Sequence, residues 1–327
     1  MDALIRCNKF LGRYYPFFTV GCVTLGLLFS GSLSALSRIT VPLFAFITFV
    51  NSLGGGFRDL FQVVRHPKPV ITVFVLLHLM MPLAAMGLGT LLFPDSPLFT
   101  LGLILEYSIP TAVASLMWAG MAGGNVTLSL SILLLDTVLA PVVVPLTLRI
   151  LVGSVVEMDA AGMMGDLLIM VGIPALLAMA LYDSTHGRSA KTVKPVLDPF
   201  AKLGLLVVIV ANATSCAPFL RQLNRTLVLV IAATIGLCLF GYFLGFYIGL
   251  LQNKSFPIAM SMGINTGMRN TSAGAVLASQ YFPPEVIFPV AFTPLFLQVS
   301  AATVTRILLR TKPGRAWQAA QQANTSP

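Results

Sequence analysis

Four side chains that can carry a charge lie within long apolar segments of the chain: His78, Glu106, Asp136 and Arg269. Histidine and the two acids can gain or lose a proton, whereas arginine keeps its proton and can only bind an anion. Charges buried in apolar surroundings often line a path for ions or substrate. We therefore expect proton transfer or anion binding. No enzyme activity is expected, because Ser115 lacks the histidine and acid pattern of a nucleophile.

Two of these apolar segments are interrupted by helix-breaking and small polar residues. One interruption runs from Glu106 through Pro110 to Ser115, and the other runs from Gly263 to Ser272. Non-helical backbone survives inside a membrane only where protein or a water-filled cavity satisfies its polar groups. Paired interruptions of this kind point to the binding site of a transporter. The alternative is that the proline and the glycines merely kink packed helices.

The composition assigns these segments to a lipid bilayer. Hydrophobic residues make up 57% of the 327 residues and charged residues only 9%, whereas soluble domains contain about 25% charged residues. A spanning helix needs about 20 residues. The sequence therefore predicts an all-α membrane protein with ten transmembrane helices, at about 14–35, 39–62, 69–93, 98–121, 125–152, 163–182, 199–217, 226–250, 256–280 and 285–309.

The positive charges predict the orientation of these spans. With the N-terminus in the cytoplasm, 15 of the 20 lysines and arginines lie on the cytoplasmic side and four on the other, as the positive-inside rule requires. We expect a bacterial cytoplasmic (inner) membrane, both termini in the cytoplasm, and a first span that is not cleaved as a signal peptide. The charges are scattered, so no nucleic-acid partner is expected. No haem, nucleotide or metal motif predicts a cofactor.

The two interruptions occupy equivalent places in the two halves of the chain. They fall in the fourth and ninth predicted spans, so each is the fourth span of a five-span half. A half with an odd number of spans is followed by a half of opposite orientation. The sequence thus predicts two inverted five-helix repeats, with broken helices four and nine meeting near the membrane midplane.

Three stretches, in order and at matching spacing, resemble the bile acid:sodium symporter family. Residues Val64–Leu83 are similar to the third helix of that family and the residues leading into it, and Pro110–Pro141 is similar to its fourth and fifth helices. The run Gly267-Met268-Arg269-Asn270 resembles the Gly-Met-Gln-Asn signature of its broken ninth helix. The likeness covers most of the chain, from the second span to the tenth.

The resemblance implies a single membrane domain divided into a panel and a core. The panel would contain the spans at about 14–62 and 163–217. The core would contain those at about 69–152 and 226–309, where broken helices four and nine cross, and residues 311–327 would form a cytoplasmic tail. Members of the family carry organic anions, including bile acids and smaller carboxylates, usually with two sodium ions beside the crossing.

The positions that match the sodium ligands of the family have changed. They correspond here to His78, Ser115-Leu116, Ser129, Leu133, Asn265 and Arg269. Leucine offers no oxygen to sodium, and arginine places a permanent cation where a cation should bind. We therefore expect transport without sodium, with three remnants of the sodium sites at Ser115, Ser129 and Asn265.

Each intramembrane charge has two interpretations. The candidate anionic partners of Arg269 are Asp136 and Glu106, and Asp136 shares a helix face with Ser129 and should point toward Arg269. The two could form a static salt bridge that holds the crossing together, or they could act in coupling and substrate binding. His78 could relay protons, or it could be a neutral residue that donates to a backbone carbonyl. Glu106 could be a second coupling acid or a solvated acid at a cavity mouth.

The predicted function is secondary transport of small organic anions by alternating access, without sodium and with protons as a candidate coupling ion. Substrate contacts are expected from Ser115, Asn265, Arg269, Asn270 and Gln298. The ion-coupling or internal charge network is expected to consist of His78, Glu106, Asp136 and Arg269. Two alternatives stay open: a non-transporting receptor or scaffold on a transporter fold, and a sodium symporter with altered sites.

Overall fold

The computed structural model describes four ranges of the chain: residues 2–61, 67–153, 158–220 and 224–325. Within them the secondary structure is helical apart from one isolated β-bridge. The expectation of an all-α protein is therefore confirmed. Val64, Arg65 and His66 of the family motif, and Arg221 of the charge count, lie outside the described residues.

Short connections join the helices. The first half of the chain contains α1 (Asp2–Leu28), α2 (Ser30–Leu33), the 3-10 helix η1 (Ser34–Ile39), α3 (Thr40–Ser52), α4 (Phe57–Phe61), α5 (Pro67–Val75), the π-helical turn η3 (Leu76–Met80), α6 (Met81–Leu92), α7 (Pro97–Ser108), α8 (Ala114–Met121) and α9 (Val126–Val152). The second half contains α10 (Ala160–Leu167), the π-helical turn η4 (Leu168–Gly172), α11 (Ile173–Ser184), α12 (Arg188–Thr192), α13 (Lys194–Leu220), α14 (Arg225–Asn253), α15 (Phe256–Gly267), α16 (Thr271–Tyr281), α17 (Pro284–Phe292), α18 (Pro294–Leu309) and α19 (Lys312–Thr325).

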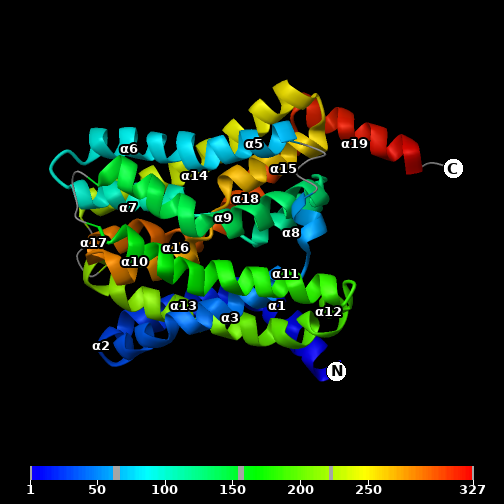
Figure 1. The fold of residues 1–327 in the computed structure, drawn as a ribbon. Helices are drawn as coiled ribbons and strands as arrows, with labels where there is room; N and C mark the ends of the chain where they lie inside the picture. The colour runs from blue at the N-terminus through cyan, green and yellow to red at the C-terminus, as the bar shows by residue number, and fades with distance from the viewer. Residues whose placement is uncertain (1, 62–66, 154–157, 221–223, 326–327) are drawn as a thin grey trace.

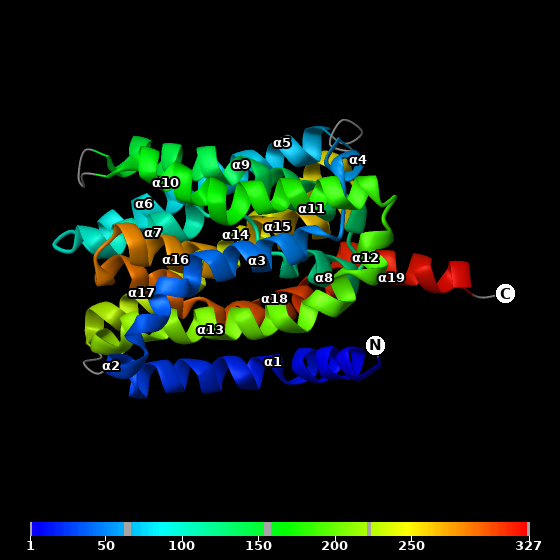
Figure 2. The ribbon, with the colours of Figure 1, turned by 60° about the horizontal axis from the view of Figure 1, so that its bottom comes forward.

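Two groups of helices are named here after the division expected from the sequence, and their members can be followed in Figure 1. Helices α1–α4 and α10–α13 form the panel group, in which α1 and α3 both pack on α13. Helices α5–α9 and α14–α18 form the core group, in which α14 packs against α15, and α7 packs against α6 and α17. Both chain ends lie at the same end of the molecule, as Figure 2 shows from a second direction.

Six helical segments among the described residues are long and apolar enough to cross a membrane: Ser30–Ser52, Pro67–Leu92, Val126–Val152, Ala160–Ser184, Lys194–Thr214 and Arg225–Asn253. A seventh span results if Pro284–Phe292 and Phe296–Leu309, which meet at an angle of 41°, are counted together. The protein is therefore a multi-pass membrane protein. The number of ten spans stays a prediction.

The expected spans 98–121 and 256–280 do not qualify as single helices because each is divided. Pro110 has no backbone N–H to continue a helix, and α7 ends just before it at Ser108. In the other segment α15 ends at Gly267, and Asn270 caps the start of α16 by accepting a hydrogen bond from the backbone of the third helical residue. Each of the four resulting helices, α7, α8, α15 and α16, is too short to cross a membrane alone.

The second expected span, 39–62, ends earlier than predicted. Helix α3 stops at Ser52, because three consecutive glycines follow at 54–56 and disfavour a helix. The short helix α4 then begins at Phe57, whose N–H donates to Asp183 Oδ2 at 3.0 Å. The glycine run is thus a turn within the panel group, between α3 and α4.

Each π-helical turn stands just before a proline. Leu76–Met80 precedes Pro82, and Leu168–Gly172 precedes Pro174. Because proline cannot donate, the regular bond from that position is missing. In the first turn the preceding donor, Met81 N–H, reaches back five residues to the carbonyl of Leu76. This turn contains His78, and π-helical turns occur frequently at functional sites.

Side-chain hydrogen bonds join the panel group to the core group at both ends of the molecule. Tyr281 Oη on α16 donates to Asp166 Oδ2 on α10 at 2.6 Å, toward the end away from both termini. Ser131 Oγ on α9 donates to the carbonyl oxygen of Asp59 on α4 at 2.7 Å, near the opposite end. Both bonds have to change if the two groups move relative to each other.

The polar end of the chain, expected as a tail, forms helix α19, which contacts the core group through Trp317 and then projects away from the bundle (Figure 1). The ring of Trp317 stacks on Phe256 at the start of α15, with centroids 5.2 Å apart. It also covers Gly123, where an added Cβ would come within 2.1 Å of the Trp317 ring. Gly123 has a φ of 74°, which glycine adopts without strain.

Candidate functional site

The break between α7 and α8 and the break between α15 and α16 contact each other in the core group. Thr111 and Arg269 form an antiparallel β-bridge. Asn270 N donates to the carbonyl oxygen of Pro110 at 2.8 Å, and Thr111 Oγ1 donates to the carbonyl oxygen of Asn265 at 2.9 Å. These bonds satisfy backbone groups that helix ends leave free. Each break is therefore the hydrogen-bonding partner of the other.

Asn265 on α15 connects the two serines that match sodium ligands of the family. Its Oδ1 accepts from Ser115 Oγ at 2.9 Å, and its Nδ2 donates to Ser129 Oγ at 3.0 Å and to the carbonyl oxygen of Ser261 at 2.8 Å. All four residues are fully buried. The side chains of Ser115 and Asn265 thus face protein, and the structure does not bring these two expected substrate contacts to a cavity.

His78 and Asp136 form a buried acid–histidine pair. His78 Nε2 lies 2.7 Å from Asp136 Oδ1, and Asp136 Oδ2 accepts from Thr111 N at 2.6 Å. The side chain of His78 is 8% exposed and that of Asp136 is 0% exposed. The alternative in which His78 donates to a backbone carbonyl is therefore wrong. The pair is linked to the crossing through a single hydrogen bond from Thr111.

Arg269 is buried at the crossing without a direct salt bridge to Asp136. Its Nη1 donates to the carbonyl oxygen of Ile109 at 3.3 Å, and its guanidinium carbon lies 5.8 Å from the centre of the Tyr107 ring, within reach of a cation–π interaction. Asp136 acts on Arg269 only through longer-range electrostatics. The alternative of a static salt bridge between Arg269 and Asp136 is wrong, because His78 and a backbone N–H already occupy the two carboxylate oxygens.

Glu106 on α7 is fully buried in the core group. It interacts with Thr293, at the bend between α17 and α18, and with the positive charge of Arg269. The alternative of a solvated acid at a cavity mouth is therefore wrong. The Glu106 carboxylate and the Arg269 guanidinium attract each other without a direct salt bridge in the described part of the chain, and this attraction lowers the cost of burying either charge alone.

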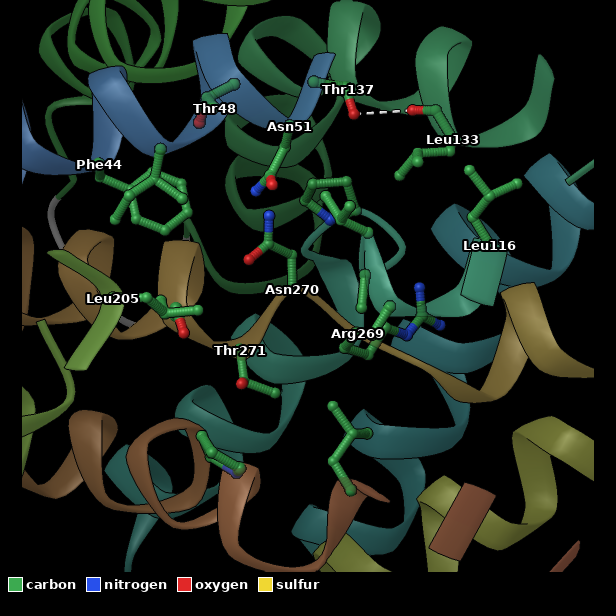
Figure 3. A pocket seen from close by; sticks show the side chains of 18 of the residues that line it. Phe44, Thr48, Asn51, Leu116, Leu133, Thr137, Leu205, Arg269, Asn270 and Thr271 are labelled. Atoms are coloured by element: carbon green, nitrogen blue, oxygen red, sulfur yellow. Dashed lines mark hydrogen bonds between the residues drawn. The ribbon is translucent and has the colours of Figure 1, made fainter. Parts of the chain in front are cut away.

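A cavity of about 360 Å³ lies between the panel group and the core group, beside the crossing (Figure 3). This volume is in the range of small-molecule binding sites. Apolar side chains form most of the wall, and the expected substrate contacts Arg269, Asn270 and Gln298 border it. The described lining residues include no aspartate and no glutamate. The arrangement can therefore hold an uncharged or anionic molecule with an apolar body.

Asn51 and Lys194 are polar residues of the cavity wall that the sequence did not indicate as site residues. Asn51 on α3 points toward Asn270 across the cavity (Figure 3). Lys194, the first residue of α13, donates from Nζ to the carbonyl oxygen of Asn51 at 3.3 Å. Lys194 is one of the 15 lysines and arginines assigned to the cytoplasmic side, because the seventh span was expected to begin at 199. A lysine just before an apolar run was the one signal that could have indicated it.

A multi-pass helical membrane protein in which two interrupted helices meet beside a cavity has the architecture of a membrane transporter. Comparison with known proteins agrees with this class. The sequence model described as the Sodium Bile acid symporter family matches residues 40–222. The chain belongs to this family.

Similar proteins cover most of the chain. The uncharacterized protein YbaS of Bacillus subtilis is 40% identical over 295 residues, which is 90% of this chain and 96% of that protein. The uncharacterized sodium-dependent transporter YocS of the same organism is 25% identical, over 92% of each chain. The probable sodium/metabolite cotransporter BASS1, chloroplastic, of Arabidopsis thaliana is 28% identical, over 81% of this chain and 66% of that protein. The protein is therefore a transporter and not an enzyme.

Proposed function

We propose that the protein is a secondary transporter of small organic anions, either bile-acid-like molecules or smaller carboxylates, and that it works by alternating access. The cavity between the two helix groups carries this proposal. Its polar wall consists of amides, hydroxyls, Lys194 and Arg269, without a carboxylate among the described lining residues, and a positive wall attracts anions. A site between two bodies of helices can open to either side when one body rocks against the other.

The proposed topology is ten spans in two inverted five-helix repeats, with both termini in the cytoplasm of a bacterial inner membrane. In this arrangement α7 and α8 together form the fourth span, and α15 and α16 form the ninth. The position of both chain ends at one end of the molecule supports an even number of spans. The excess of lysine and arginine in the same set of loops supports the orientation.

The proposed transport does not use sodium. Sodium needs several oxygen ligands, but the hydroxyl oxygens of Ser115 and Ser129 are hydrogen-bonded to the side chain of Asn265. The Nδ2 group of Asn265 is a donor and offers nothing to a cation. Arg269 adds a positive charge to the same crossing, and this charge cannot be removed by deprotonation.

The pair of His78 and Asp136 is the proposed site of proton coupling. Both groups can exchange a proton, and both are buried in the core group beside the crossing. Asp136 accepts a hydrogen bond from Thr111 N inside the first break. A bond to a carboxylate is about twice as strong as a bond to a neutral group, so protonation of Asp136 would weaken the contact that holds this break.

Uptake into proteoliposomes tests these proposals, with labelled cholate and labelled short-chain carboxylates as substrates. We expect accumulation under an imposed proton gradient, with no change when sodium is replaced by potassium. Asp136→Asn should abolish gradient-driven accumulation while exchange of labelled for unlabelled substrate continues. Asp95→Asn, in the turn between α6 and α7, is the exposed control and should behave like the parent.

The other outcomes separate the alternatives. Accumulation driven by a sodium gradient would replace the proposal with sodium symport, the second candidate, which the names of the relatives YocS and BASS1 favour. Equilibration that ignores both gradients would identify a uniporter. A complete absence of anion transport under all conditions would refute the transport proposal and favour a receptor or scaffold.

A further inference from the structure

Lys194 is a partly exposed cation on the wall of the cavity. Its side chain lies where the end of α3 and the following turn, including Asn51 and Gly54, complete the lining. The hydrogen bond recorded for its Nζ goes to the carbonyl oxygen of Asn51, at a long distance of 3.3 Å. An ammonium group has three hydrogens to donate. Among the described residues no other partner takes these hydrogens, so two of them remain for a bound molecule.

The backbone makes room for this ammonium group at Gly54. A Cβ atom added at Gly54 would come within 2.9 Å of Lys194 Nζ, closer than ordinary contacts allow. Glycine lets the ammonium lie directly against the backbone of the turn. A larger residue at 54 would push the ammonium away from this position.

Lys194 is the accessible positive charge of the described cavity wall. Arg269 also borders the cavity, but it is 1% exposed and its Nη1 bonds to the carbonyl oxygen of Ile109 in the core group. Asp198, one turn further along α13, acts on Lys194 electrostatically but does not line the cavity. One accessible cation, without an acid beside it on the wall, suits a molecule with a single acidic group.

Asn51 and Asn270 offer hydrogen bonds to the uncharged part of such a molecule. They point toward each other from α3 of the panel group and from the break before α16 of the core group (Figure 3). Asn270 Oδ1 accepts from Ala273 N at 3.4 Å as the cap of α16, so its Nδ2 hydrogens are left for the cavity. Apolar residues such as Phe44 and Leu205 complete the wall. A molecule between the two amides contacts both helix groups.

We propose that Lys194 binds the acidic group of the transported molecule, while Asn51 and Asn270 bind its hydroxyl or carbonyl groups. The ligand class is an organic monoanion with a hydrogen-bonding group on an apolar body. This inference rests on the proposed transport of organic anions and adds the residue that selects the charge. Loss of a hydrogen bond to a charged group should weaken binding of the acid about 10- to 100-fold.

Trp118 provides a direct measurement of binding that does not depend on transport. Its Nε1 donates to Gln298 Oε1 at 2.7 Å, and Gln298 lines the cavity. The chain has two tryptophans, so Trp317→Phe leaves Trp118 as the single reporter. The fluorescence of Trp118 would be titrated with straight-chain carboxylates of different lengths, with cholate, and with the primary amide of each acid.

Four variants are compared in this background. Lys194→Gln should bind the acids as weakly as the parent binds the amides, whereas Lys194→Arg should keep the preference for acids. Gly54→Ala should weaken binding of the acids and leave binding of the amides unchanged, because it displaces the ammonium. Lys202→Gln is the matched control: Lys202 lies two turns further along α13 and bonds to Asn8 rather than lining the cavity.

The outcomes separate this inference from the transport proposal. If the parent prefers acids to amides and Lys194→Gln keeps that preference, Lys194 does not select the charge, and anion transport stands. If the parent itself binds no acid better than its amide, the proposal of anion transport is wrong, and the proposed role of Lys194 is wrong as well. If Lys194→Gln does not fold, Lys194→Met decides: it removes the charge but keeps most of the length of the side chain, and an unchanged preference for acids in that variant would overturn the role of Lys194.

Discussion

The buried pair of His78 and Asp136 leads to a quantitative prediction for stability. Asp136 accepts one hydrogen bond at each carboxylate oxygen, from His78 and from Thr111 N. Asp136→Asn keeps the shape of the side chain but replaces one acceptor with an NH₂ donor. His78 can accept from this donor only as the tautomer with its proton on Nδ1, an atom that is buried without a hydrogen-bond partner among the described residues. An unsatisfied buried donor costs about 1–3 kcal/mol, and removing one charge of a buried pair costs about 3–5 kcal/mol.

We therefore expect Asp136→Asn to lower the free energy of unfolding by about 2–4 kcal/mol, a range that runs from the midpoint of the first cost to the midpoint of the second. His78→Gln should lower it as well, and the double variant should lose about 1–2 kcal/mol less than the sum of the single variants because the two residues touch. Unfolding in detergent micelles by added sodium dodecyl sulfate, followed by circular dichroism, measures these values.

The exposed control Asp95→Asn should stay within about 0.5 kcal/mol of the parent. Strictly additive losses in the cycle would mean that His78 and Asp136 do not stabilise each other in the folded protein. A loss for Asp136→Asn no larger than that of the control would mean that the carboxylate is not held by the two bonds described here. Either result would refute the reasoning.

Three further predictions concern other parts of the molecule. Sodium should not raise the melting temperature relative to potassium at equal ionic strength, because a stabilising ion must bind the folded state; a sodium-specific rise would contradict the loss of the sodium sites. Gly123→Ala should destabilise the protein by about 1–3 kcal/mol, because it adds a Cβ both at positive φ and beneath the Trp317 ring. When Gly123→Ala is combined with Trp317→Ala, part of this loss should disappear, and thermal unfolding measures both effects. Tyr281→Phe removes the hydrogen bond to Asp166 and should shift the conformational equilibrium by about 0.5–1.5 kcal/mol away from the conformation described here. A cysteine placed at Ser52 on the cavity wall should then react more slowly with a thiol reagent. An unchanged reaction rate would argue against a gating role for the bond between Tyr281 and Asp166.

The interrupted helices could be predicted from the sequence because their causes are local. Pro110 cannot continue a helix, and Asn270 is a favourable cap for the helix that follows it. The membrane class follows equally directly from composition. The contact between the two breaks, however, was expected from the symmetry of the halves, and its hydrogen bonds required the structure.

The partners of the buried charges could not be predicted from spacing alone. The shared helix face of Ser129 and Asp136 indicated the direction of the carboxylate, but several groups lie in that direction. Asp136 pairs with His78 rather than with Arg269 for two reasons. The π-helical turn at Leu76–Met80 sets the position of the imidazole, and the carbonyl oxygen of Ile109, just after α7, accepts a hydrogen bond from the guanidinium. A helix-wheel argument contains neither of these effects.

The cavity residues of the panel group were missed for a different reason. Asn51 and Lys194 stand at helix ends, where predicted boundaries are least accurate. The sequence assigned Lys194 to a loop because charge usually marks the end of a span. In the structure α13 begins at this residue, so the same charge faces a cavity.

The contact between the two breaks also constrains how the protein is made. Thr111 donates to the carbonyl oxygen of Met268, which follows it by 157 positions. At about 5–20 residues per second, synthesis of the intervening chain takes roughly 8–30 s. Throughout that interval the first break has entered the membrane without the polar groups that satisfy its backbone, a state that lipid disfavours by several kcal/mol per group. The nascent first half must therefore wait in a polar environment, at the insertion machinery or around trapped water, until α15 arrives to complete it.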